Sequence, residues 1–205
     1  MVPSDLNAVL GMVERYLASL SEKFGEKDKK QYYEDLVGVR EEFFKAIKDG
    51  GEYPDQYKTN PKLKRSLYPT DMFPHIFLGT KLSKNPYESV VQPASSMISN
   101  GQQWDSPNVW APNNWILHEV LESKDEKFKV AEQWVKTTYC SWKQNFAIYE
   151  KYSANDLGKR GEGGEYEVQI GFGWSNGLAL YYLGCLLYTS PSPRDLSTSR
   201  MPSSA

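Results

Sequence analysis

The chain contains few of the residues that build metal sites and disulfide frameworks. Its 205 residues include two cysteines, Cys140 and Cys185, and no Cys-x-x-Cys or Cys/His spacing typical of zinc binding occurs. The two histidines, His75 and His118, are isolated in the sequence. Isolated histidines are more often hydrogen-bonded structural residues than metal ligands. We therefore expect neither a disulfide scaffold nor a metal site.

Strong charge and long apolar runs are also missing. The formal net charge is −2, which gives no field to attract DNA, RNA or an anionic membrane. No run of apolar residues is long enough to cross a bilayer. The opening residues MVPSDLNAVL lack the basic start and apolar stretch of a signal peptide. We expect no nucleic-acid partner, and any signal or membrane anchor would lie outside these residues.

Sequence signals for nucleotide binding and for a catalytic triad are absent as well. No phosphate-binding loop motif occurs, and the segment 171–176 lacks the third glycine of a dinucleotide fingerprint. Neither histidine lies near a turn that would present a nucleophilic serine. We therefore expect no phosphate-binding loop, no dinucleotide-binding fingerprint and no Ser-His-Asp triad.

Aromatic residues are abundant, at 14% of the chain with 6 Trp and 14 Tyr. Two segments combine them with carboxylates, amides, Gly and Pro: QWDSPNVWAP at 103–112 and GGEYEVQIGFGWSNG at 163–177. Aromatic faces stack on the apolar faces of sugar rings, while carboxylates and amides bind ring hydroxyls. Both segments read as too irregular for helix or strand. Composition alone leaves well-packed structural loops as an equal alternative to a polyol site.

Apolar residues at helical spacing predict an all-α chain. Ser4 or Asp5 is expected to cap the first helix, whose stripe is Leu6, Val9, Leu10, Val13, Leu17 and Leu20, with Gly25 as its stop. Further helices are expected at about 32–47, 73–82, 113–121, 125–151 and 174–187. Long loops between helices are uncommon unless they carry function. Helical hairpins with such loops fit a toroid of helices, with the loops converging at one end.

Residues 187–205 differ from the rest. They are rich in Ser, Pro, Thr and Arg and lack a packing face. This composition is typical of a disordered linker, or of adaptor sequence joined to a truncated reading frame. We favour the second interpretation, and we expect a helical part at 1–186 and a disordered or artefactual tail, excluded from function, at 187–205.

Two glutamates are candidates for chemistry. Glu150 lies between Tyr149 and Lys151 near the predicted exit of the long helix, where a raised pKa would suit a base. Glu165 lies among glycines that let the backbone approach a ligand. The alternative for each is an ordinary surface glutamate paired with a nearby lysine.

The two segments resemble the motifs of the trehalase family. QWDSPNVWAP at 103–112 matches the pattern Q-W-D-x-P-x-G/A/V-W-P/A/S-P at every fixed position. The segment 163–177 resembles the family's glycine-rich G-G-G-G-E-Y followed by Q-x-G-F-G-W-S/T-N-G. The opening VPSDLN at 2–7 is similar to V-P-V-D-L-N. The resemblance extends over about 2–183.

The resemblance implies an inverting glycoside hydrolase that splits α,α-trehalose into two glucose molecules without a metal or organic cofactor. In such enzymes an acid protonates the leaving oxygen and a base activates water from the opposite face. The family's general base, the Glu of its E-K-Y segment, falls on Glu150. Its sugar-contacting Glu falls on Glu165. The Q-W-D segment implies Trp104 as a stacking face and Gln103 and Asp105 as polar or supporting groups.

The resemblance also implies that this chain is a C-terminal half fragment. The family's general acid lies in a G-W-D-F-S-S-R-W segment upstream of V-P-V-D-L-N, and no such segment occurs here. The family fold is an (α/α)6 toroid, so the resemblance implies an incomplete (α/α)6 toroid here, and a toroid lacking half its helices is expected to expose apolar faces. Two positions depart from the family: Glu162 replaces a glycine, which would add strain if that position needs positive φ, and Ser4 replaces a valine.

Two other functions stay open on the sequence. One is a non-catalytic helical module that keeps the sugar loops for binding, and the other is a purely structural scaffold. Compartment cannot be read from these residues, although animal members of the family favour a secreted or membrane-anchored parent enzyme.

Overall fold

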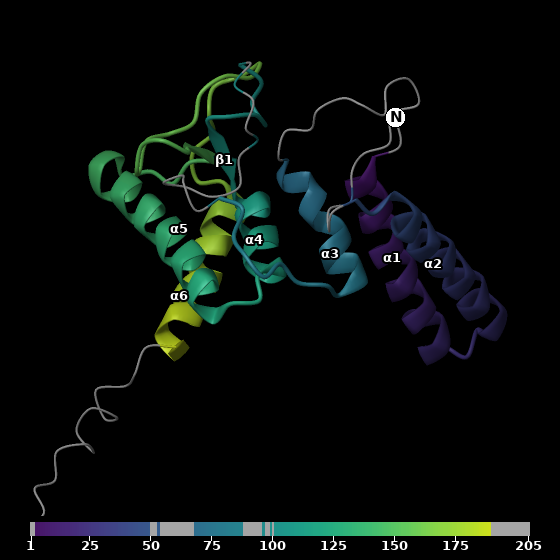
Figure 1. Ribbon diagram of the computed structural model, residues 1–205. Helices are drawn as coiled ribbons and strands as arrows, with labels where there is room; N and C mark the ends of the chain where they lie inside the picture. Colours follow the sequence, from purple (N-terminus) through teal and green to yellow (C-terminus); the bar gives the residue numbers. More distant parts are fainter. Residues whose placement is uncertain are drawn as a thin grey trace, which may run out of the picture.

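The computed structural model describes residues 3–49, 53, 68–87, 96, 99 and 101–189, with side chains described as far as 185. Within these ranges the protein is helical with one small two-stranded sheet. Figure 1 shows a helical hairpin, α1 and α2, at one end of the molecule and α4, α5 and α6 grouped at the other, with α3 between them. The all-α fold is confirmed, and the toroid stays a prediction.

The hairpin consists of α1 (Ser4–Lys23) and α2 (Lys27–Ile47). Gly25 lies in the turn between them with φ of 75°, so the predicted stop is confirmed. The predicted cap is wrong: Pro3 occupies the N-cap position, and no side chain caps the helix there. Ser4 and Asp5 lie inside the first turn, where the negative charge of Asp5 interacts favourably with the positive end of the helix dipole.

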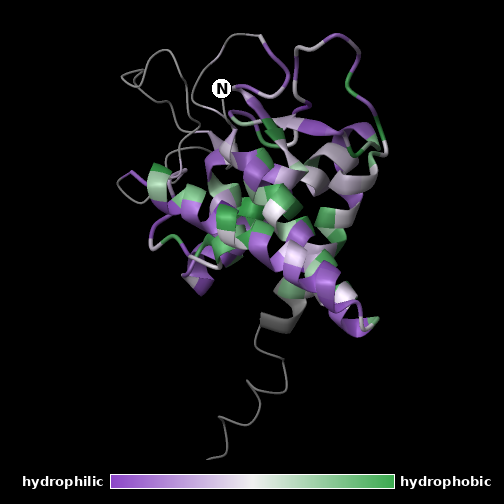
Figure 2. Cartoon of the chain, turned by 90° about the vertical axis from the view of Figure 1, so that its right-hand side faces the viewer, coloured by the Kyte–Doolittle hydropathy of each residue, from purple (hydrophilic) through white to green (hydrophobic). Residues whose placement is uncertain are grey.

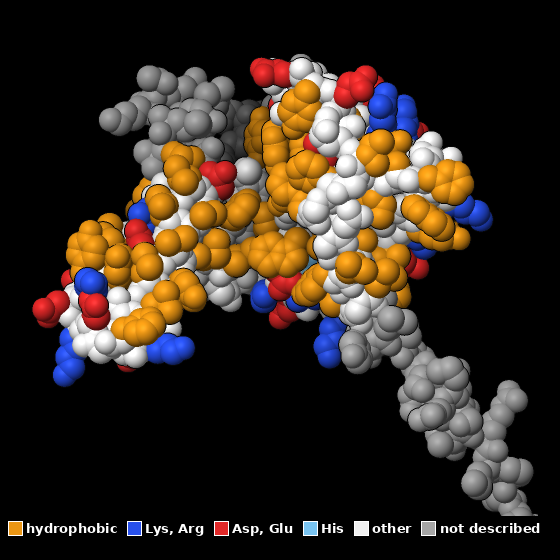
Figure 3. All heavy atoms as spheres, turned by 180° about the vertical axis from the view of Figure 1, so that it is seen from behind, with side chains coloured by type: hydrophobic (Ala, Val, Ile, Leu, Met, Phe, Trp, Pro, Cys, Tyr) orange, Lys and Arg blue, Asp and Glu red, His pale blue; other side chains and the backbone are white. Residues whose placement is uncertain are grey.

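The buried face of α1 is not its apolar stripe. Its buried residues are small or polar: Ser4, Ala8, Gly11, Glu14, Ala18 and Ser21. Gly11 packs against the Phe77 ring so closely that a Cβ would lie 2.5 Å from it. Leu6 and Val13 are 52% and 48% exposed. Seen from behind, apolar side chains gather over this hairpin (Figure 3), so α1 presents an apolar face that the described residues do not cover.

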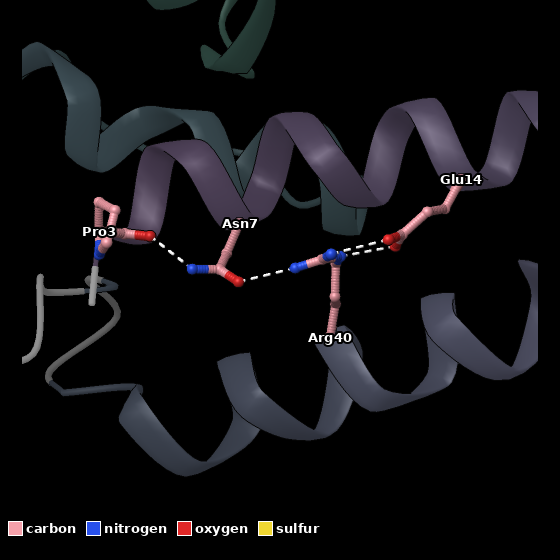
Figure 4. Close-up of polar contacts among 4 residues, drawn as sticks. All are labelled: Pro3, Asn7, Glu14 and Arg40. Atoms are coloured by element: carbon pink, nitrogen blue, oxygen red, sulfur yellow. Dashed lines mark hydrogen bonds and ion pairs between the residues drawn. The ribbon is translucent and has the colours of Figure 1, made fainter.

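A buried ion pair joins the two helices of the hairpin (Figure 4). The Arg40 guanidinium donates two hydrogen bonds to the Glu14 carboxylate, at 2.5 and 2.7 Å. It donates a third to the Asn7 side-chain oxygen at 2.7 Å, and the Asn7 amide donates to the Pro3 carbonyl at 2.7 Å. The opening motif, which contains Pro3 and Asn7, therefore orients α1 against α2.

The second half of the fold is built around the helices α4, α5 and α6. The elements are a 3-10 turn η1 (Pro69–Met72), α3 (Phe73–Leu78), β1 (Asn108–Trp110), α4 (Ala111–Val120), α5 (Lys124–Asn145), β2 (Lys151–Ser153) and α6 (Gly173–Thr189). Helix α5 packs on α4 and α6. Buried residues from strands and helices together form the core beneath the loops: Val109, Ala111, Ala131, Trp134, Tyr152, Ala154, Leu178, Ala179 and Tyr182.

Two expectations about this half were wrong. The long helix ends at Asn145 rather than near 151, because Phe146 adopts a left-handed conformation with φ of 54°. The segment 103–112 is not wholly irregular, since 108–110 form β1. This strand pairs antiparallel with β2, with Trp110 opposite Lys151. The early helix end frees residues 146–150 to turn back toward the sheet.

Hydrophobic positions concentrate in the helices, while the loops above them are mostly hydrophilic (Figure 2). Within the described ranges, no helix combines the length and apolar character that crossing a bilayer requires. Helix α6 continues to Thr189, slightly past the predicted start of the tail. Residues 190–205 of the predicted tail lie outside the described residues.

Candidate active site

Glu150 lies where the two polar-aromatic segments meet. It follows the helix end by five residues and immediately precedes β2, so the prediction that it sits at a helix exit was wrong. Its N–H donates to the Gln169 carbonyl at 3.0 Å. Its carbonyl accepts from the Ser175 hydroxyl at 3.2 Å and the Trp174 indole N–H at 3.4 Å. The glycine-rich segment and the start of α6 thereby fix the backbone of Glu150.

The Glu150 carboxylate is buried, and it is not the surface glutamate of the alternative reading. The residue is 0% exposed, and neither carboxylate oxygen has a hydrogen-bond partner among the described residues. Burial raises the pKa of Glu150, while the Lys151 charge and the Gln169 backbone bond act in the opposite direction. A buried acid with a raised pKa and free acceptor oxygens is a candidate for proton transfer.

Three tryptophans from the two segments form one cluster beside Glu150. Trp104 stacks on Trp110 with 4.1 Å between ring centroids and 11° between planes. Trp174 meets both rings edge-on, at 6.1 and 5.6 Å. Trp110 is 2% exposed, whereas Trp104 is 45% exposed. The buried ring therefore supports Trp104 from one side, and part of the Trp104 ring stays open to solvent.

Gln103 and Asp105 lie on either side of Trp104 and have different surroundings. The Gln103 carbonyl accepts the Trp110 indole N–H at 2.7 Å, which holds the cluster to the loop. The Gln103 side-chain oxygen is buried without a hydrogen-bond partner among the described residues. Asp105 accepts from the Ser96 hydroxyl at 2.7 Å. Gln103 therefore keeps a buried acceptor without a hydrogen-bond partner among the described residues, and Asp105 supports the loop.

Glu165 lies on the exposed part of the glycine loop. Residues 160–168 line an open hollow of about 410 Å³. Gly164, next to Glu165, packs against Gln103, where a Cβ would lie 3.0 Å from the Gln103 Cβ. The two loops are thus in contact beside Glu165, while Glu165 itself stays exposed.

The expected strain at Glu162 is not present. Positive φ angles occur at Gly163 (76°) and Gly164 (95°), and among the described non-glycine residues only Phe146 has one. The Glu162 carboxylate is exposed and lies 3.6 Å from the Lys159 ammonium. Glu162 is accommodated because the turn places its positive φ angles at Gly163 and Gly164 and not at residue 162.

Sequence reasoning missed two residues that connect the loops. Asn108 is 2% exposed; its side-chain oxygen accepts the Glu162 N–H at 2.9 Å, and its amide donates to the Asp105 carbonyl at 3.3 Å. Lys151 is fully buried beneath the glycine loop. Asn108 falls on an unspecified position of the Q-W-D pattern, so the motif did not mark it. Lys151 is the lysine of the E-K-Y segment, but nothing in the sequence indicated its contacts with the glycine loop.

The histidines are structural, as predicted. The His75 ring nitrogen lies 2.8 Å from the Thr80 hydroxyl, and the His118 ring nitrogen lies 3.1 Å from the Glu119 carboxylate. Burial lowers the pKa of both rings. Among the described residues, no three of His, Cys, Asp and Glu are grouped as metal ligands would be.

The chain is similar to known trehalases along its whole length. A sequence model of the trehalase family matches residues 1–186. Periplasmic trehalase of Salmonella enteritidis is 31% identical over 100% of this chain and 38% of its own length. Putative periplasmic trehalase of Salmonella typhi is 32% identical with the same coverage. The chain thus spans less than two fifths of these relatives. The family match, together with the contact between the two matched loops, establishes that the chain belongs to the trehalase family.

Proposed function

We propose that the chain forms part of an enzyme that hydrolyses α,α-trehalose with inversion, and that Glu150 is the general base. The single observation that carries this assignment is the buried Glu150 carboxylate without a hydrogen-bond partner among the described residues. The carboxylate thus keeps two acceptor oxygens that the described residues do not use, which is the capacity a base needs to bind its water. Its raised pKa moves it toward the neutral range in which a general base is most effective.

In this mechanism Glu150 takes a proton from water as the water attacks the anomeric carbon. An acid on the opposite side of the glycosidic bond protonates the leaving oxygen, about 6.5–9.5 Å from the base. We assign that acid to the part of the family's length that this chain does not cover. Attack from the face opposite the leaving group gives inversion, so the products are one β-glucose and one α-glucose.

The two loops would bind the disaccharide. The exposed part of Trp104 provides the stacking surface, Glu165 accepts hydrogen bonds from ring hydroxyls, and Gln103 supports the cluster through its bond to the Trp110 indole. Asp105 supports the loop through Ser96. Trp110 keeps Trp104 in place by stacking.

The apolar face of α1 supports a larger complete fold. Leu6, Val9, Leu10 and Val13 are each at least 36% exposed on this one helix. Burying such a stripe against another helix is strongly favourable. We propose that further helices of the complete enzyme cover this face.

The test uses the complete enzyme that contains this chain. Proton NMR of the first-formed products should show α- and β-glucose in equal amounts before mutarotation; α-glucose alone would indicate retention and contradict the proposal. Glu150→Gln should lower kcat by about 10³-fold while trehalose still binds. The matched control is Glu132→Gln on α5, whose carboxylate forms an exposed pair with Lys136. Normal turnover by Glu150→Gln would exclude Glu150 as the base, and binding without turnover in the unaltered enzyme would favour a sugar-binding module.

A further inference from the structure

Lys151 is a buried cation that the proposed mechanism does not use. It is 0% exposed and opens β2, directly after Glu150. Its ammonium nitrogen lies 5.4 Å from the centroid of the Trp110 ring. Burying an ammonium is unfavourable unless it is hydrogen-bonded or paired. The contacts that compensate this burial indicate what the residue does.

Those contacts go to the glycine loop. The Lys151 ammonium donates to the Gly163 carbonyl at 2.8 Å and to the Glu162 carbonyl at 3.2 Å. The Lys151 carbonyl accepts the Gly161 N–H at 3.0 Å. A Cβ on Gly161 would lie 2.9 Å from Cγ of Lys151, so the loop rests directly on the lysine stem. One residue therefore holds three consecutive residues of the loop.

The position of Lys151 connects the two proposed functional carboxylates. Glu150 is its neighbour in the chain, and Glu165 follows the turn at Gly163 and Gly164. Lys159 also reaches this loop, through the Glu162 carboxylate at 3.6 Å. That second contact is exposed, with side chains 55% and 74% accessible, so it should contribute little. The buried contacts of Lys151 therefore fix the loop together with the hydrogen bond from the Glu162 N–H to the Asn108 side-chain oxygen.

We propose that Lys151 is a positioning residue that holds the loop 162–165, and with it Glu165, at a fixed place relative to Glu150. The inference rests on the proposed hydrolysis of trehalose. Without the ammonium, the two carbonyls lose their donor and the loop moves more freely. Glu165 is then no longer held in place before the sugar arrives, so sugar binding weakens more than the chemical step.

Three variants of the complete enzyme test the proposal. Lys151→Met keeps most of the stem and removes the donors. Gly161→Ala disturbs the seat of the loop from the loop side, because its Cβ would lie 2.9 Å from Cγ of Lys151 and 2.5 Å from the Asn108 side-chain oxygen. Lys159→Met is the control, since it removes the exposed contact to the same loop. Amide hydrogen exchange of residues 161–168 without substrate is measured together with kcat and KM for trehalose.

We expect Lys151→Met to speed exchange across the loop by about 10-fold. Its KM should rise roughly 10- to 100-fold, with a smaller fall in kcat. Gly161→Ala should change both quantities in the same direction, and Lys159→Met should change neither. A lower melting temperature in Lys151→Met with unchanged KM and unchanged loop exchange would overturn the proposal, because that is the result of a merely structural lysine.

These outcomes distinguish a failure of the positioning role of Lys151 from a failure of the proposed hydrolysis of trehalose. An unaltered enzyme that does not hydrolyse trehalose contradicts the proposed function, and loop exchange then decides the positioning role alone. If Lys151→Met does not fold, Gly161→Ala decides, and normal exchange with normal KM in that variant overturns the proposal.

Discussion

Two buried glutamates in different regions of the molecule have opposite surroundings. Glu14, in the α1–α2 hairpin, is 8% exposed, and both its oxygens accept hydrogen bonds from Arg40. Glu150, beneath the loops, is 0% exposed, and neither oxygen has a hydrogen-bond partner among the described residues. A paired carboxylate stabilises a fold, whereas an unpaired one is unfavourable for it. The hairpin therefore uses its glutamate for structure, and the loops keep theirs available for a reaction.

Removing the partner of Glu14 should have the largest effect on stability. Arg40→Met leaves the Glu14 carboxylate buried without its donors and deprives Asn7 of a hydrogen bond. We expect the free energy of unfolding to fall by about 3 kcal/mol, the lower end for breaking a buried pair. Denaturant unfolding at neutral pH measures it. A loss below about 1 kcal/mol would mean that the pair behaves like a surface salt bridge.

Neutralising Glu150 should act in the opposite direction. Glu150→Gln removes a buried charge without a hydrogen-bond partner, so we expect the free energy of unfolding to rise by about 1 kcal/mol at neutral pH. Stability and activity would then change in opposite senses in one variant. A destabilisation as large as that of Arg40→Met would show that the Glu150 carboxylate does have a stabilising partner in the complete enzyme.

The pH dependence of the stability of Glu150→Gln tests whether the raised pKa of Glu150 is the cause of this gain in stability. Because burial raises the pKa of Glu150 in the folded state, the folded protein binds more protons than the unfolded chain above the ordinary glutamate pKa of about 4.3. This contribution to stability declines as the pH rises from there to the folded pKa. His75 and His118, whose pKa values are lowered, act in the opposite sense but are common to both proteins. The stability difference between variant and unaltered protein should therefore grow with pH, and a flat difference would contradict the raised pKa.

An exposed pair on the same hairpin should have the smallest effect. Arg15 and Glu41 form a salt bridge at 3.1 Å with side chains 48% and 42% exposed. Glu41→Gln should change the free energy of unfolding by no more than about 0.5 kcal/mol, because solvent screens the pair. Comparing this loss with the loss in Arg40→Met separates the contribution of burial to the free energy of unfolding from the contribution of charge. Equal losses in the two variants would remove burial as the explanation.

Apolar spacing predicted where the helices lie better than it predicted which face of each helix is buried. The order of the helices follows from apolar spacing, but the buried face of α1 is made of Ala8, Gly11 and Ala18. Small residues allow α1 to approach its neighbours closely, and hydrophobic periodicity gives them little weight. The end of α5 was missed because Phe146 takes a left-handed conformation that glycine or asparagine usually adopts.

The site was predicted from motifs, and its internal connections were not. Resemblance pointed to Trp104 and Glu165, which lie on the two loops that contact each other, and to Glu150, which immediately precedes β2. The pairing of Trp110 with Lys151 joins residues far apart in the chain, and three-residue strands leave no periodic signal. The Lys151 ammonium donates to backbone carbonyls. Because every residue has a backbone carbonyl, no sequence pattern predicts these contacts.

The short sheet has a consequence for how this region can change its length during evolution. Trp110 opposite Lys151 sets the register, and side chains alternate between the two faces of a strand. Deleting or inserting one residue between Phe146 and Glu150 would shift that register and send each side chain of β2 to the opposite face. The stretch at 146–150 should therefore keep a constant length among functional relatives. Insertions should be accepted instead at exposed residues 155–157, where the chain leaves the sheet.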